Sequence, residues 1–202
     1  MKRTILCLLL ALLFIIPAGC SKKQEGQEIE EFIKEYYLNS FPNSYKEEDK
    51  VLVLDCIEND NGGYVLVHYA GEGPDMYLYK YEKNETGFNV TQKCQGEMTG
   101  SGLFSINLIC EDGKYIYFGQ FSVSHWEPST DVRTYIDVKE ITFKDSSGKA
   151  VTKDLTDKGG YICILDSKFK DFQVIDSSGN VALDYATYKR QEYPIYNCEY
   201  ME

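Results

Sequence analysis

Hydrophobic side chains follow two different periods along the chain. Over residues 28–40 they recur at the i, i+3, i+4 and i+7 spacing of one helix face, at Ile29, Phe32, Ile33, Tyr36 and Tyr37. Acidic residues at the start of this segment suit the positive end of a helix, and Pro42 disfavours helical backbone before it. The pattern therefore predicts an amphipathic helix that ends near Ser40.

From Val51 onward the period changes to two, which is the period of a β-strand. The first half contains four such runs, at residues 51–57, 64–69, 76–82 and 88–91. Turn signals rich in Gly and Asn separate them, so neighbouring strands should pair antiparallel. The first two runs are apolar on both faces and need cover on both sides, which the helix and a second sheet can supply.

The second half contains six further runs that predict strands, at residues 104–110, 115–121, 135–143, 161–165, 169–175 and 181–185. Residues 122–131 between them have no clear period and predict an irregular loop. The patterns together predict a mainly β (α+β) protein, with the N-terminal helix followed by antiparallel meanders in a sandwich-like arrangement. The helix and first meander occupy residues 28–94, and a second meander over residues 103–202 packs with them as one unit.

Two local features of the second half are specific enough to predict local geometry. The apolar phase shifts between Val138 and Ile141, which indicates a bulge or bend near Lys139 and Glu140. The tetrapeptide Asp-Ser-Ser-Gly occurs at residues 145–148 and again at 176–179. Asp can bond the backbone beyond it and Gly supplies positive φ, so both copies should be hairpin connections.

The N-terminus has the order of a signal peptide. Lys2 and Arg3 precede an unbroken apolar run over residues 5–16. As a helix this run is about 18 Å long, which is short for a bilayer core of about 30 Å. Residues 1–19 are therefore interpreted as a signal peptide, followed by a polar, flexible linker over residues 20–27.

Ala18, Gly19 and Cys20 follow the apolar run. This end of the chain resembles the lipobox of bacterial lipoproteins. The resemblance implies cleavage after Gly19, a diacylglycerol group on the thiol of Cys20, and a protein held on the extracytoplasmic face of the cell membrane. Two buried acyl chains give a stable anchor, whereas one chain binds only marginally.

A second, less specific resemblance covers residues 115–184, which are similar to the C-terminal part of uncharacterised lipoproteins of Gram-positive bacteria. The shared features lie at Phe118 and Gly119, at residues 138–143 and 161–165, and at residues 176–181. This resemblance implies no known activity.

The net charge of the chain bears on the kind of partner that the protein can bind. Without residues 1–19 the chain keeps 19 basic and 32 acidic side chains, a net charge of −13. Such a surface disfavours nucleic acid as a partner.

Five cysteines remain besides Cys20 once residues 1–19 are removed. Export permits disulfides, but an odd number of cysteines cannot all pair within one chain. The pairing therefore stays open among Cys56, Cys94, Cys110, Cys163 and Cys198. Cys56, Cys110 and Cys163 fall within apolar runs and are interpreted as small buried side chains.

The residues that could carry chemistry are few. On alternation His68 shares a strand face with Tyr64 and Leu66, and it is interpreted as a structural residue near a sheet edge. His125, Trp126 and Glu127 stand together in the predicted loop and form the candidate binding loop. Tyrosines share one face of a strand at residues 77, 79 and 81, which indicates either a ligand-binding face or a half-buried sheet face.

No nucleophile, phosphate-binding or metal-ligating motif occurs in the sequence. We therefore expect no catalytic, cofactor or metal site, and a non-enzymatic module that binds or scaffolds an envelope protein or glycan. The alternative is a small envelope hydrolase or ligand-binding protein with an acidic pocket, because carboxylates are numerous.

Overall fold

The structure is a computed structural model that describes residues 21–40, 51–69, 75–97, 104–121, 124–127, 129–135, 137–155, 159–191 and 194–198. Within these ranges only the backbone is described for residues 21–27, 75, 97, 124–127 and 132–135. The signal peptide, Gly19 and Cys20 lie outside the described residues. The described part is mainly β, with antiparallel sheets and few helices, so the predicted fold class is confirmed at that level.

The first sheet is the predicted meander of four antiparallel strands. Its order is β1 (Val51–Asn59), β2 (Gly62–Tyr69), β3 (Asp75–Asn84) and β4 (Gly87–Glu97). Helix α2 (Ser21–Ser40) packs on one face of it, where Ile29, Ile33 and Tyr37 are buried. The backbone of α2 begins at Ser21, within the segment over residues 20–27 that was predicted as a linker.

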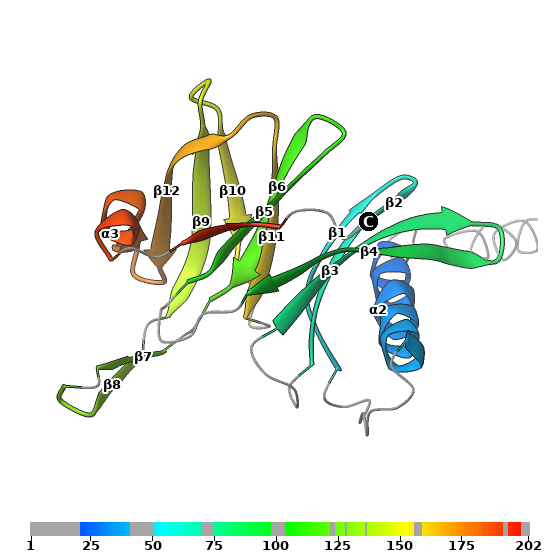
Figure 1. The fold of residues 1–202 in the computed structure, drawn as a ribbon, viewed down its shortest axis with the longest axis horizontal. Helices are drawn as coiled ribbons and strands as arrows, with labels where there is room; N and C mark the ends of the chain where they lie inside the picture. The colour runs from blue at the N-terminus through cyan, green and yellow to red at the C-terminus, as the bar shows by residue number, and fades with distance from the viewer. Residues whose placement is uncertain are drawn as a thin grey trace, which may run out of the picture.

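The second half of the chain divides between two further sheets. The middle sheet has the order β11 (Gly160–Leu165), β6 (Lys114–Gln120), β5 (Ile106–Glu111) and β14 (Ile195–Asn197), with β14 parallel to β5. The outer sheet has the order β10 (Ala150–Asp154), β9 (Val138–Asp145), β12 (Phe169–Asp176) and β13 (Val181–Asp184). In Figure 1 the layers run from α2 on the right, through the first, middle and outer sheets, to α3 (Tyr185–Arg190) on the left.

The predicted second meander over residues 103–202 is therefore wrong. β10 and β12 belong to the outer sheet, but β11, which lies between them in the sequence, pairs with β6 in the middle sheet. Its apolar side chains explain this place, because Tyr161 and Cys163 pack toward the outer sheet while Ile162 packs toward the first. A strand that is apolar on both faces needs a layer with cover on both sides.

Two further expectations for the second half are corrected. Residues 122–131 are not wholly irregular, because β7 (Ser124–Glu127) and β8 (Val132–Tyr135) form an antiparallel ribbon that projects from the lower left of the body in Figure 1. The predicted strand over 181–185 ends at Asp184, which begins α3 instead. The Asp184 carboxylate accepts a hydrogen bond of 2.7 Å from the backbone N–H of Thr187, as an N-cap residue does.

The two local predictions for the outer sheet are confirmed. In the pairing of β9 with β12, Glu140 lies opposite Ile175 and Val138 opposite Asp176, so Lys139 is the extra residue of a bulge. Both Asp-Ser-Ser-Gly turns join paired strands, and Gly148 and Gly179 have φ of 89° and 85°. In each turn an Asp oxygen accepts the backbone N–H groups two and four residues further on, at 2.8–2.9 Å.

One carboxylate joins all three sheets. A register shift between Val53 and Asp55 turns the Asp55 side chain of β1 into the interior, where it is 6% exposed. One of its oxygens accepts the backbone N–H of Ile162 in β11 at 2.7 Å, and Lys153 of β10 lies 2.8 Å from the same oxygen. This junction fixes the relative positions of the sheets.

Cys94 and Cys198 form a disulfide that links β4 to the residue after β14. Of the remaining thiols, Cys163 is buried and Cys56 is half-buried, as their apolar runs indicated. Burial raises the pKa of Cys163 to about 12 and that of Cys56 to about 11, which keeps both thiols protonated. Cys110 is exposed, so its predicted burial is wrong. It is paired with Tyr115, one pair before the β5–β6 turn, where the sheet is near its end.

Candidate functional site

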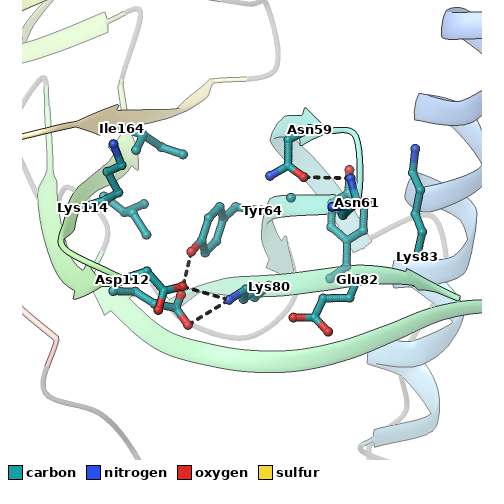
Figure 2. A pocket seen from close by; sticks show the side chains of 14 residues that line it. Asn59, Asn61, Tyr64, Lys80, Glu82, Lys83, Asp112, Lys114 and Ile164 are labelled. Atoms are coloured by element: carbon teal, nitrogen blue, oxygen red, sulfur yellow. Dashed lines mark hydrogen bonds and ion pairs between the residues drawn. The ribbon is translucent and has the colours of Figure 1, made fainter.

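A hollow lies where the first and middle sheets separate at their hairpin ends. It has a volume of about 510 Å³ and is called here the hairpin cleft. The cleft is lined by residues of the β1–β2 hairpin, of β3 and of the β5–β6 hairpin, and by one residue of β11. The lining residues labelled in Figure 2 are Asn59, Asn61, Tyr64, Lys80, Glu82, Lys83, Asp112, Lys114 and Ile164. The cleft therefore forms only when two sheets pack together.

The inner wall of the cleft is an ion network centred on Glu111. The hydroxyl of Tyr64 donates to one carboxylate oxygen at 2.6 Å. The ammonium groups of Lys93 and Lys80 lie 2.7 Å and 3.3 Å from the other oxygen. The Glu111 side chain is only 10% exposed, so these three donors satisfy a charge that water reaches poorly.

This network sets the protonation of Glu111. Burial alone would raise the pKa of its carboxyl. The hydrogen bonds from Lys93 and Tyr64 outweigh that effect, together with the charge of Lys80, and hold the pKa below its ordinary value. Glu111 is therefore an anion near neutral pH whose two oxygens are both occupied.

Glu111→Gln should be less stable than the wild type at neutral pH, by about 1.5–3 kcal/mol for lost hydrogen bonds to a charged group. Because the folded pKa is depressed, the stabilisation is present above the unfolded pKa of 4.5 and is lost as the pH falls through the folded value. Urea unfolding of both proteins between pH 7 and pH 3 measures this. A stability difference that stayed constant over that range would contradict the role of the charge.

The outer part of the cleft offers polar groups over an apolar floor. Ile116 and Ile164 belong to the hydrophobic contact between the first and middle sheets and form the floor. Glu82 is exposed at the rim, and the Asn59 side chain accepts the backbone N–H of Asn61 at 3.1 Å, which fixes the β1–β2 turn. Acidic and basic side chains are balanced here, so the cleft presents donors and acceptors without a strong net charge.

The sequence-predicted binding loop lies elsewhere. His125, Trp126 and Glu127 are on β7, opposite Thr134, Arg133 and Val132 of β8. Their ribbon and the β1–β2 hairpin stand at opposite sides of the body in Figure 1. Those three residues therefore do not contribute to the hairpin cleft, and their role in binding stays a prediction.

The tyrosine face of β3 is covered. Tyr79 and Tyr81 are buried and Tyr77 is partly buried in the core beneath α2, where Tyr36 contacts Tyr79 with ring centroids 5.9 Å apart. This face is more deeply covered than the half-buried alternative predicted, and it is not open to a ligand. His68 lies on β2, an inner strand of the first sheet, so its predicted place near a sheet edge is wrong.

One sequence signal could have indicated the cleft. Lys80 shares a strand face with Leu78, and Leu78 is fully buried between the sheets. A charged residue on an otherwise buried face needs a partner, and Glu111 in a distant hairpin supplies it. The identity of that partner depends on sheet packing, which alternation along one strand does not encode.

Compared with known proteins, the chain matches no family model, no curated protein and no solved structure. Within the described ranges, no three His, Cys, Asp or Glu side chains are grouped so that they could hold a metal ion. In that same part of the chain, no helix has both the length and the apolar character needed to cross a membrane.

Proposed function

We propose that this protein is a lipid-anchored lipoprotein of the extracytoplasmic membrane face, and that it acts as a non-enzymatic binding module of the cell envelope. The signal-like residues 1–19 and the Ala18-Gly19-Cys20 sequence support the anchor. The disulfide between Cys94 and Cys198 supports an oxidising location outside the cytoplasm. In this proposal α2 and the sandwich-like sheets form a rigid body that presents one binding site.

We assign the binding site to the hairpin cleft, and its ligand to an envelope glycan. The observation that carries this assignment is the composition of the lining. Asn59, Asn61 and Glu82 offer planar hydrogen-bonding groups at the rim, while Ile116 and Ile164 form an apolar floor. A sugar has hydroxyl groups at its edges and apolar C–H faces, so it fits a site with a few convergent polar groups above an apolar surface.

The charges in the cleft favour binding over hydrolysis. A two-carboxylate hydrolase needs one carboxyl group with a raised pKa as proton donor. The buried carboxylate of the cleft is Glu111, whose pKa is lowered and whose oxygens are held by Tyr64, Lys80 and Lys93. The neighbouring carboxylate, Asp112, is 81% exposed.

Glu82→Ala should weaken glycan binding about tenfold or more, which is the value of one hydrogen bond to a charged group. The probe is a mixture of soluble glycan fragments released enzymatically from the envelope of the source cells, and the measurement is titration calorimetry with the purified soluble domain. Asp154→Ala is the matched control, because Asp154 is an exposed strand carboxylate away from the cleft. The control should bind like the wild type.

Equal binding by Glu82→Ala and wild type would contradict the assignment of the cleft. Loss of glycan binding in Trp126→Ala, with binding by Glu82→Ala unchanged, would indicate that the site lies on the β7–β8 ribbon. Absence of any binding by the wild-type domain would contradict a glycan ligand.

A further inference from the structure

Ring contacts fix the direction in which α2 crosses the first sheet. Phe32 packs on Phe88, which is paired with Lys83 near the β3–β4 turn, with ring centroids 5.3 Å apart. Five residues later, Tyr37 packs on Tyr77 and on Tyr69, near the opposite end of the same strands. The helix therefore runs antiparallel to β3, and its N-terminal end points toward the hairpin end of the sheet.

The start of α2 reaches the level of the hairpin turns. Phe88, which Phe32 contacts, is paired with Lys83, and the backbone N–H of Lys83 bonds the carbonyl oxygen of Asn61 in the β1–β2 turn at 2.9 Å. This contact places Phe32 near the level of the turns. Ser21 precedes Phe32 by eleven helical residues, which span about 16 Å in the same direction. Ser21 thus lies at or beyond the turns that form the rim of the hairpin cleft.

Cys20 is bonded directly to Ser21. We infer that the hairpin cleft faces the bilayer, and that its ligand is carried by the membrane itself, as the sugar headgroup of a glycolipid. This inference rests on the proposed lipid anchor and glycan ligand. A helix that begins next to the anchor keeps the hairpin end of the body near the bilayer, whereas a long flexible coil would let every face approach the lipid.

Site-specific fluorescence quenching tests the orientation. Cys110→Ser removes the exposed thiol, and single cysteines are then introduced by Thr86→Cys at the β3–β4 turn and by Leu52→Cys at the far end of β1. Both positions are exposed, and they are about 30 Å apart along the strands. The lipid-modified protein is labelled and reconstituted in phosphatidylglycerol vesicles that contain a lipid with a quencher on its headgroup.

Strong quenching at Thr86→Cys and weak quenching at Leu52→Cys is the expected result. The reverse pattern, or equal quenching at both positions, would overturn the orientation while leaving the anchor intact. Protein that failed to associate with vesicles at all would instead contradict the proposed anchor, so the two failures are distinguishable.

A second arm tests the ligand with the same vesicles. A probe attached through Asn61→Cys, at the cleft rim, should change its emission when a diglycosyl diacylglycerol is added to the lipid mixture. The same addition should have no effect in the Glu82→Ala background. An unchanged signal in both proteins would overturn the glycolipid assignment, whatever the orientation arm returned.

Discussion

Asp55→Ala is expected to lower the free energy of unfolding by about 3–5 kcal/mol, the usual cost of removing one partner of a buried ion pair. The substitution leaves the ammonium group of Lys153 without its carboxylate and the backbone N–H of Ile162 without its acceptor. Because these groups belong to different sheets, the loss should also loosen the packing between sheets. Urea unfolding at pH 7 measures the change.

Asp166→Ala is the matched control for Asp55→Ala. Asp166 also pairs with two cationic groups, those of Lys114 and Lys149, but its side chain is 51% exposed. Water and salt screen such a pair, so its removal should change stability by a small fraction of the Asp55 effect. Asp55→Asn keeps an acceptor for the Ile162 N–H and should fall between the two. Equal losses for Asp55→Ala and Asp166→Ala would contradict the junction.

Removing the disulfide is expected to cost about 2–5 kcal/mol, because a cross-link that closes a long loop restricts the unfolded chain strongly. Cys94 and Cys198 are 104 residues apart in sequence, and their bond fastens the chain end beyond β14 to the first sheet. The double variant Cys94→Ala, Cys198→Ala avoids leaving an unpaired thiol. Thermal unfolding of this variant should match that of the wild type in reducing agent.

Cys110→Ala serves as the control for the disulfide prediction. Its thiol is exposed and outside the disulfide, so its loss should leave the melting temperature nearly unchanged. A wild-type melting temperature that did not respond to reducing agent would contradict the disulfide and remove one support for an extracytoplasmic location.

Sequence patterns predicted individual strands better than their assembly. The bulge at Lys139 and the turns at Asp145 and Asp176 were predictable, because backbone geometry there depends on a few neighbouring residues. The position of β11 in the middle sheet was not predictable, because alternation shows which faces of a strand are apolar but not which strand pairs with it.

The same limit explains why the sequence did not indicate the hairpin cleft. The sequence favoured Trp126 in a predicted loop. The hairpin cleft is instead lined by residues of separate hairpins, such as Tyr64 and Glu111, which are far apart in sequence and read individually as part of a strand or turn. The buried ion pair of Asp55 could not be predicted from the sequence either, because it depends on a register shift in β1 that the apolar pattern does not indicate.

The proposed lipid anchor is tested most directly by intact mass analysis of the protein extracted from membranes of the source cells, with fragmentation of its N-terminal peptide. We predict a mature chain that begins at Cys20 and carries a diacylglycerol group on the thiol, and a Cys20→Ala protein that moves from the membrane to the soluble fraction. A mature chain with an unmodified Cys20, or a Cys20→Ala protein that stays in the membrane fraction at high salt, would contradict the lipid anchor and the orientation inferred from it.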